Sequence, residues 1–275
     1  MTKHDTLRLA LLQTAGDPGN STAANLDRLA AAAAEAAARG AGLLVAPEMF
    51  LSGYAIGREA AARAAEPLDG PSARRAAEIA RRYGIALAYG YPERDPDGAI
   101  YNAALLIGAD GQTLLNYRKT HLFGDLDRSM FAAGDTLGRV ARVGGFTVGL
   151  LICYDVEYPE AVRTLALAGA DLVVVPTANM KPYAHVSHLL VPARACENKV
   201  YVAYANRVGS EGALDYLGLS CVADPDGANI LLAGEEDGLF FADVQRARLD
   251  TALNAYMTDR RPDLYRSLSQ AVPTS

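Results

Sequence analysis

The sequence predicts a mixed α/β fold, and three observations support this. Strand-like and helix-like patterns alternate along most of the chain. Several strand-like runs are wholly apolar, which is typical of strands covered on both faces. A hairpin pattern at 100–107 and 112–119, around Asp110 and Gly111, adds antiparallel strands to the sheet. Because no linker or low-complexity tract interrupts the pattern, we expect one domain over residues 1–275, with a polar tail from about residue 251.

The remaining elements follow from periodicity and from the residues that end them. An Ala-rich helix stops at Gly40, a second helix stops at Gly84, and Pro159 is suited to the first position of a third. Strands are expected at residues 7–13, 43–46, 85–91, 146–152, 171–176, 200–206, 219–223 and 229–232. Helices are expected at about residues 22–39 and 72–83, from 159 onward, and at 186–198.

The composition excludes several classes of protein. The chain has 26 Lys and Arg against 32 Asp and Glu, a net charge of −6, which gives no electrostatic reason to bind nucleic acid or an anionic membrane. No run of about 20 apolar residues and no secretory signal is present. The three cysteines form no CxxC pair, so a reducing, cytoplasmic setting is expected.

Three reactive side chains follow predicted strands: Glu48, Lys119 and Cys153. Ligands collect beyond the carboxyl ends of strands in α/β sheets, so these groups can converge on one site. A carboxylate can take the proton of a thiol, and an ammonium can stabilise a thiolate and an oxyanion. Taken singly, each also has an ordinary interpretation: a buried thiol, a loop carboxylate and a surface lysine.

The segments around these residues resemble the nitrilase superfamily, the carbon–nitrogen hydrolases. Three blocks in the family's order carry the resemblance: residues 47–50 (PEMF), 117–123 (YRKTHLF) and 153–160 (CYDVEYPE). Residues 101–102 (YN) and 176–179 (PTAN) extend it. Within the superfamily, the blocks are most similar to the bacterial 5-aminopentanamidase and stereoselective amidase group.

The resemblance implies a four-layer αββα sandwich that dimerises into an eight-layer assembly. It also implies a catalytic triad that needs no metal and no cofactor. Cys153 would be the nucleophile, Glu48 the general base and acid, and Lys119 the cation that stabilises the oxyanion together with the backbone N–H of Tyr154. The partners would be a small amide and water.

Other candidate residues follow from the same resemblance. Many members carry a second glutamate in the loop after the lysine; here that place holds Asp127, with Asp125 as a competing candidate, and either could be a plain loop carboxylate. Tyr54 and Asn179 are further substrate-binding candidates. His185 and His188 lack a third ligand for zinc. Cys196 and Cys221 are expected to be core thiols.

Glu157 bears on the choice of substrate. The ω-amidases, which act on dicarboxylate monoamides, place Arg at this position, whereas a carboxylate would favour a cationic end. The sequence therefore predicts an amidase for an ω-amino amide such as 5-aminopentanamide. An N-carbamoyl amidohydrolase acting, for example, on N-carbamoylputrescine and a catalytically silent scaffold are the alternatives. Glu157 could instead bind a neighbouring Arg or cap the next helix.

Overall fold

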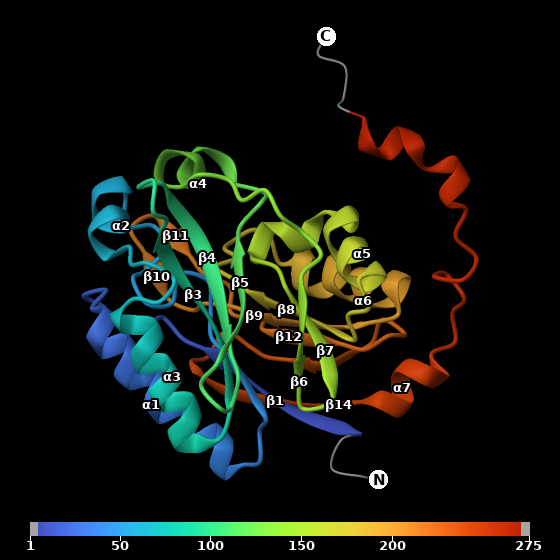
Figure 1. The fold of residues 1–275 in the computed structure, drawn as a ribbon, viewed down its shortest axis with the longest axis horizontal. Coiled ribbons are helices and arrows are strands. Elements are labelled where there is room, and N and C mark those ends of the chain that lie inside the picture. The colour runs from blue at the N-terminus through green and yellow to red at the C-terminus, as the bar shows by residue number, and fades with distance from the viewer. Residues whose placement is uncertain (1–4, 271–275) are drawn as a thin grey trace.

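Two six-stranded sheets form the centre of the molecule (Figure 1). The computed structural model describes residues 5–270. The first sheet has the order β14-β1-β2-β3-β4-β5 and the second has the order β13-β12-β9-β8-β7-β6. No helix among residues 5–270 is long and apolar enough to cross a membrane.

Three central strands of each sheet run parallel, and the outer strands pair antiparallel. The strands of the first sheet are β1 (Thr6–Gln13), β2 (Leu43–Val45), β3 (Ala86–Arg94), β4 (Ile100–Ile107), β5 (Thr113–Arg118) and β14 (Gly238–Gln245). Those of the second are β6 (Val140–Val143), β7 (Phe146–Leu150), β8 (Leu172–Pro176), β9 (Tyr201–Ala205), β12 (Cys221–Ala223) and β13 (Asn229–Leu232). The expected mixed sheet and the β4–β5 hairpin are confirmed.

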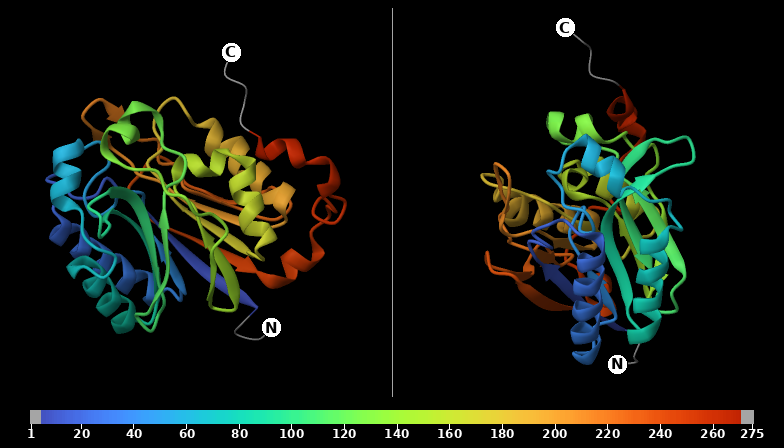
Figure 2. Two further views of the ribbon diagram at one scale, coloured as in Figure 1. Left: turned by 45° about the horizontal axis from the view of Figure 1, so that its top comes forward. Right: turned by 90° about the vertical axis from the view of Figure 1, so that its left-hand side faces the viewer.

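The layers follow from which faces are apolar. Strand residues of the two sheets, such as Leu9, Leu11, Val148 and Val173, pack together in the largest buried cluster. Helices α1 (Thr22–Ala38) and α3 (Pro71–Tyr83) cover the outer face of the first sheet. Helices α5 (Pro159–Leu167) and α6 (Val191–Asn198) cover the outer face of the second (Figure 2). This is the expected αββα sandwich, and its pairing into a dimer stays a prediction.

One end of the sandwich carries the short elements and long loops. Helices α2 (Arg58–Ala64) and α4 (Gly124–Met130) and the small hairpin of β10 (Ser210–Glu211) and β11 (Leu214–Asp215) gather there (Figure 1). A third apolar cluster fills this end: Met49, Tyr54, Ala61, Met130, Phe131, Ala178, Met180 and Tyr216. It lies beyond the carboxyl ends of the parallel strands, where the candidate reactive groups were expected.

Several elements differ from expectation. Strands β14 and β6 and helices α2 and α4 were not predicted. The helix expected at 186–198 begins with a π-helical turn, Val186–Leu190, before α6. After α7 (Arg246–Thr251) the expected polar tail also carries exposed apolar side chains, with Leu253 at 92% and Leu268 at 66% exposure. This segment extends along the side of the molecule beyond α5 (Figure 1).

Candidate active site

The three candidate catalytic residues come from three strand ends. Glu48 follows β2, Lys119 follows β5 and Cys153 follows β7. The first two strands belong to one sheet and the third to the other. A backbone hydrogen bond from Glu48 N to Thr177 O (3.3 Å), just after β8, joins the two sheets at this end. The site therefore lies where the two layers meet.

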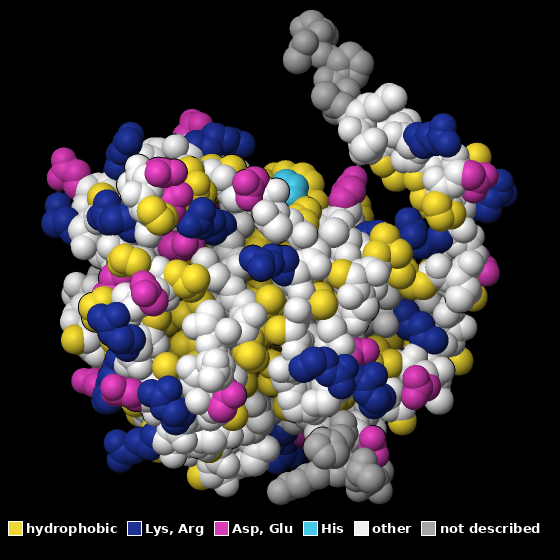
Figure 3. Space-filling model, in the orientation of Figure 1, with side chains coloured by type: hydrophobic (Ala, Val, Ile, Leu, Met, Phe, Trp, Pro, Cys, Tyr) yellow, Lys and Arg dark blue, Asp and Glu magenta, His cyan; other side chains and the backbone are white. Residues whose placement is uncertain are grey.

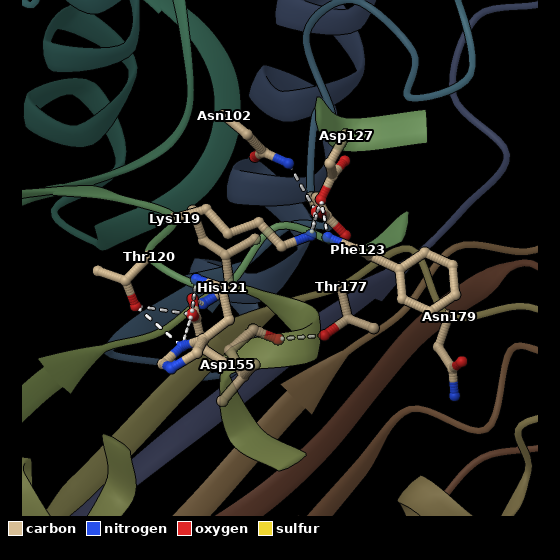
Figure 4. Close-up of polar contacts among 12 residues, drawn as sticks. Asn102, Lys119, Thr120, His121, Phe123, Asp127, Asp155, Thr177 and Asn179 are labelled. Atoms are coloured by element: carbon tan, nitrogen blue, oxygen red, sulfur yellow. Dashed lines mark hydrogen bonds and ion pairs between the residues drawn. The ribbon is translucent and has the colours of Figure 1, made fainter. Parts of the chain in front are cut away.

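Glu48, Lys119 and Asp127 form a fully buried ionic cluster. Lys119 Nζ donates to Glu48 Oε1 at 2.8 Å and to Asp127 Oδ2 at 2.7 Å. Asn102 Nδ2 donates to the same Glu48 oxygen at 2.7 Å. Figure 4 shows Asn102, Lys119 and Asp127 converging on this point. An ammonium has three N–H groups, so Lys119 keeps one N–H beyond these two bonds.

The second carboxylate oxygen of Glu48 is available for chemistry. Glu48 Oε2 has no hydrogen-bond partner among the described residues, although it is buried. Burial raises the pKa of Glu48 above its usual value; the charge of Lys119 opposes this shift and that of Asp127 adds to it. A buried carboxylate with a raised pKa and a free oxygen is suited to accept and return a proton near neutral pH.

Lys119 stays charged in this cluster. Burial alone would lower the pKa of Lys119, but its neighbours, with Glu48 first and Asp127 among them, outweigh burial and hold the pKa well above its usual value. The Tyr54 ring centroid lies 5.7 Å from the ammonium. The lysine therefore presents a permanent positive charge to the site.

Cys153 sits at the expected turn between a strand and a helix. Its φ of 44° lies in the left-handed region, which is uncommon for a residue other than glycine. The residue opens a 3₁₀ turn, Cys153–Glu157, that leads to α5. Burial and the nearby Glu48 raise the pKa of the Cys153 thiol well above its usual value, against the opposing charge of Lys119. A thiol with a raised pKa needs a base to become the reactive thiolate.

Of the two candidates for a second acid, Asp127 and not Asp125 lies beside Lys119. Both lie on α4, but Asp127 is buried and bonded to Lys119, whereas Asp125 is exposed. Asp127 Oδ2 also accepts from Phe123 N at 2.9 Å, which holds the start of α4 against the lysine. Asp127 is therefore more than a loop carboxylate.

The turn that carries Glu48 is fitted closely against β3. An added Cβ on Gly90 would lie 2.3 Å from Met49 N and 2.7 Å from Glu48 Cα, so only glycine permits this approach. Met49 has a positive φ of 48°. The buried Arg207 donates to the carbonyl oxygens of Glu48 and Met49, both at 3.3 Å, and to Ala15 O at 2.8 Å.

Among residues 5–270, no short ion pair or side-chain cap supports either structural role considered for Glu157, but the charge of Arg194 does act on its carboxylate. Arg194 donates to the backbone carbonyl of Glu157 at 2.6 Å, and its side chain pairs with Glu197 instead. No side-chain hydrogen bond caps the start of α5. The Glu157 side chain is partly exposed, and within residues 5–270 it has no ion-pair partner. Burial raises the pKa of Glu157, opposed by the charges of His185, Lys119 and Arg194.

The two other substrate-binding candidates differ in their surroundings. Tyr54 is buried with its ring toward the Lys119 ammonium. Asn179 is engaged locally: its Nδ2 donates to Tyr183 O at 3.0 Å and its Oδ1 accepts from Met180 N at 2.9 Å. Figure 4 shows the Asn179 side chain turned away from Lys119. Asn179 thus shapes the loop after β8.

A chain of aromatic rings adjoins the site. His121 stacks on Tyr158 with ring centroids 4.0 Å apart, and Tyr158 meets Tyr154 edge-on at 5.1 Å. Tyr154 contacts Phe123 at 5.3 Å, and Phe123 contacts Tyr183 at 5.9 Å. In Figure 3, hydrophobic and acidic side chains lie next to a histidine near the top of that face. Tyr154 directly follows Cys153 and Tyr158 directly follows Glu157, so the chain of rings adjoins the nucleophile and Glu157 in sequence.

Comparison with known proteins decides the family. A model of the carbon-nitrogen hydrolase family matches residues 8–252. The chain belongs to this family. The resemblance to the nitrilase superfamily is thereby confirmed, and this carbon–nitrogen hydrolase is an enzyme that acts on C–N bonds.

Two curated relatives cover nearly the whole carbon–nitrogen hydrolase chain. The "Hydrolase in pqqF 5'region" of Pseudomonas protegens is 54% identical over 96% of this chain and 93% of its own. The "(R)-stereoselective amidase" of a Pseudomonas species is 38% identical over 93% of this chain and 92% of its own.

A solved amidase from Nesterenkonia sp. has the same fold. It is 38% identical, with a TM-score of 0.86 over 96% of this chain and 97% of its own. A structure of a glutamate-to-glutamine mutant of that amidase shows covalent addition of the acetamide moiety of fluoroacetamide at the active site cysteine. This mutant is 36% identical to the present chain, with a TM-score of 0.82 over 96% of this chain and 97% of its own.

No role was assigned from the sequence to four polar residues of the site, although two of them, Asn102 and Asp155, stand in the segments that carry the resemblance. Asn102, Asp155 and Arg207 are buried and contact either a candidate catalytic residue or its neighbours in the chain. Glu211 accepts hydrogen bonds from the backbone N–H groups of Tyr54 and Ala55. A signal existed for Asn102, because it is a polar residue inside the otherwise apolar β4.

The two candidate histidines and the two remaining thiols were considered for other roles. No group of three or more His, Cys, Asp or Glu side chains within residues 5–270 could hold a metal ion. His185 and His188 are exposed. Cys221 is buried as expected, whereas Cys196 is partly exposed and contacts Asn254.

Proposed function

We propose that Cys153, Glu48 and Lys119 hydrolyse a small carboxamide through a thioester. The observation that carries the proposal is the free, buried Oε2 of Glu48, whose other oxygen is held by Lys119 and Asn102. The covalent adduct at the cysteine of the Nesterenkonia amidase supports the nucleophilic role of Cys153. The intact triad argues against a catalytically silent scaffold.

The first half of the reaction forms the acyl-enzyme. Glu48 takes the proton of the Cys153 thiol as sulfur attacks the amide carbon. The carbonyl oxygen becomes an oxyanion, which accepts hydrogen bonds from the remaining N–H of Lys119 and from the backbone N–H of Tyr154. Tyr154 lies in the first turn after the nucleophile, where helical N–H groups lack partners within the helix. Glu48 then gives its proton to the leaving nitrogen, and ammonia departs as the C–N bond breaks.

The second half releases the acid. Glu48 accepts a proton from water as the water oxygen attacks the thioester carbon. The tetrahedral intermediate collapses, the C–S bond breaks, and Glu48 returns its proton to the sulfur. The products are a carboxylic acid and the resting thiol, so the balance needs no metal or other cofactor.

The proposed substrate is an ω-amino amide such as 5-aminopentanamide. Glu157 supports this choice because its half-buried carboxylate forms no ion pair with a cationic side chain of the described residues. Burial also raises the pKa of Glu157, which disfavours its charged form. A substrate ammonium would add a directly paired counter-charge to the more distant charges of His185, Lys119 and Arg194.

An ammonia-release assay tests both parts of the proposal. We expect 5-aminopentanamide to exceed pentanamide about ten- to a hundredfold in kcat/KM, since a desolvated charged contact contributes about 1.5–3 kcal/mol. Glu157→Gln should remove most of this preference. Equal or better turnover of pentanamide, or a preference that survives in Glu157→Gln, would assign Glu157 a structural role.

Variants of the three cysteines test the nucleophile. Cys153→Ala should abolish turnover, while Cys196→Ala and Cys221→Ala keep it. Retained turnover in Cys153→Ala would overturn the proposed chemistry. Release of carbon dioxide together with ammonia from an N-carbamoyl compound, in preference to amide hydrolysis, would instead indicate the carbamoyl amidohydrolase reaction.

A further inference from the structure

We propose that Asp155 is a positioning residue that fixes the turn carrying Cys153 against the segment carrying Lys119. Its carboxylate is fully buried in the 3₁₀ turn, two residues after Cys153. This inference rests on the proposed function, because it concerns the geometry of the same candidate triad.

One carboxylate oxygen of Asp155 holds the segment after Lys119. Asp155 Oδ1 accepts from Thr120 Oγ1 at 2.9 Å, from the backbone N–H of His121 at 2.9 Å and from His121 Nδ1 at 2.8 Å. Figure 4 shows Thr120 and His121 meeting Asp155 in this way. Thr120 directly follows Lys119, so these bonds fix the backbone from which the lysine extends.

The other oxygen holds the residue before the nucleophile. Asp155 Oδ2 accepts from the backbone N–H of Ile152 at 3.1 Å and from the hydroxyl of Tyr117 at 2.9 Å. Ile152 directly precedes Cys153, and Tyr117 lies two residues before Lys119 on β5. A single carboxylate therefore bonds to both chain segments on which the candidate nucleophile and the candidate oxyanion cation depend.

These contacts give Asp155 a positioning role and no proton-transfer role. Both of its oxygens already accept hydrogen bonds from five groups in total, and neither Glu48 nor Cys153 is among the donors. The segment is further fixed because His121 stacks on Tyr158, with ring centroids 4.0 Å apart and planes 15° apart. Because a misplacement of about 1 Å can cost about a hundredfold in rate, such fixation matters for catalysis.

Asp155→Asn is the first variant to test. Its amide oxygen can replace Oδ1, but the NH2 group would then face the N–H of Ile152, donor against donor, next to Cys153. We expect kcat to fall about ten- to a hundredfold with KM changed less than about threefold, the pattern of an interaction needed only in the transition state. Alkylation of Cys153 by iodoacetamide should slow in parallel.

Asp224→Asn is the matched control. Asp224 is also a buried carboxylate that accepts backbone N–H groups, from Asp226 and Ala228, but it lies in the turn after β12 and contacts no triad residue. We expect this control to lower Tm while its kcat and its alkylation rate stay within about twofold of the parent enzyme.

A milder double variant covers the case in which Asp155→Asn does not fold. Tyr117→Phe with Thr120→Val removes two side-chain donors to Asp155 and keeps both backbone donors. We expect kcat and the alkylation rate to fall at least about threefold, again with little change in KM.

The outcomes separate this inference from the function beneath it. If kcat, KM and alkylation in the folded Asp155→Asn variant match those of Asp224→Asn, or if the double variant keeps the parent kcat, the positioning role is refuted while the triad stands. If Cys153→Ala stays active, the proposed function itself fails.

Discussion

Asp127→Asn probes the charge balance of the buried cluster. Two carboxylates, Glu48 and Asp127, share the ammonium of Lys119 at 2.8 and 2.7 Å. Asparagine has nearly the shape of aspartate, so the substitution removes a negative charge while an amide oxygen can still accept from Lys119 and from the backbone N–H of Phe123.

The expected magnitude follows from these two bonds. Hydrogen bonds to charged groups contribute about 1.5–3 kcal/mol and neutral ones about half as much, so the variant should lose about 2–3 kcal/mol in free energy of unfolding. For a chain of this size that loss lowers Tm by roughly 3–5 °C. Because Lys119 then forms an ion pair with Glu48 only and a weaker hydrogen bond to residue 127, its ammonium is held less firmly, and we also expect kcat to fall about ten- to a hundredfold.

The pH dependence has a definite sign. Glu48 must be ionised to accept the thiol proton, so activity is lost as the pH falls through its pKa. Burial raises the pKa of Glu48, and the charge of Asp127 adds to this rise. Removing that charge leaves Lys119 closer to an exclusive partner of Glu48, which lowers the pKa of Glu48. The acid limb of kcat/KM should therefore move to lower pH in Asp127→Asn.

The assay is ammonia release from pentanamide, whose charge does not change over the pH range. Asp125→Asn is the control, because Asp125 lies on the same helix two residues away and is exposed. We expect the control to keep the parent pH profile and Tm. An acid limb in Asp127→Asn that is unmoved, or that shifts to higher pH, would refute the charge argument.

Two further predictions concern the base and the packing beneath it. Glu48→Gln keeps the shape but not the proton transfer, so kcat should fall at least about a hundredfold, while EDTA should leave the parent activity unchanged; a fully active variant would contradict the role of Glu48. Gly90→Ala would force a Cβ to 2.3 Å from Met49 N, so the free energy of unfolding should fall by at least about 2 kcal/mol. In the control Gly238→Ala the nearest atom to the added Cβ is 3.6 Å away, so the loss should be less than about 1 kcal/mol. Equal denaturant midpoints for the two variants would contradict the packing argument.

The fold could be predicted from the sequence where a segment's own pattern decides its structure. The apolar β2 and β8 and the turn at Gly111 carry local signals, and each was found. Strand β14 lacks such a signal, because it is fixed by pairing with β1, more than 200 residues away, in the register Thr6 to Gln245. Helices α2 and α4 have seven residues each and are fixed by packing against the third apolar cluster.

The site could be predicted only in part for a similar reason. Glu48, Lys119 and Cys153 were identified because they follow strands in recognisable blocks. Asp155 stands beside Cys153 in one of these blocks, yet its role depends on Thr120 and His121, which come from the other sheet. Nothing in sequence spacing reveals that approach, since the contact exists only after the two sheets pack.

Two turns of the site contain a residue with positive φ, and a buried charged side chain contacts the backbone of each turn. Met49 and Cys153 both have positive φ, and such a conformation costs on the order of 1–3 kcal/mol unless neighbouring contacts enforce it. Arg207 donates to both carbonyls at the Glu48 turn, and Asp155 accepts from the N–H before Cys153. Each turn is thus held by one buried ion of its own, a cation against carbonyl oxygens and an anion against N–H groups. Because the two ions belong to different networks, we expect the losses in free energy of unfolding caused by Arg207 and Asp155 substitutions to add in the double variant. Their effects on kcat should not add, because both substitutions change the distance between Glu48 and Cys153. A double-mutant cycle on kcat would measure this deviation from additivity.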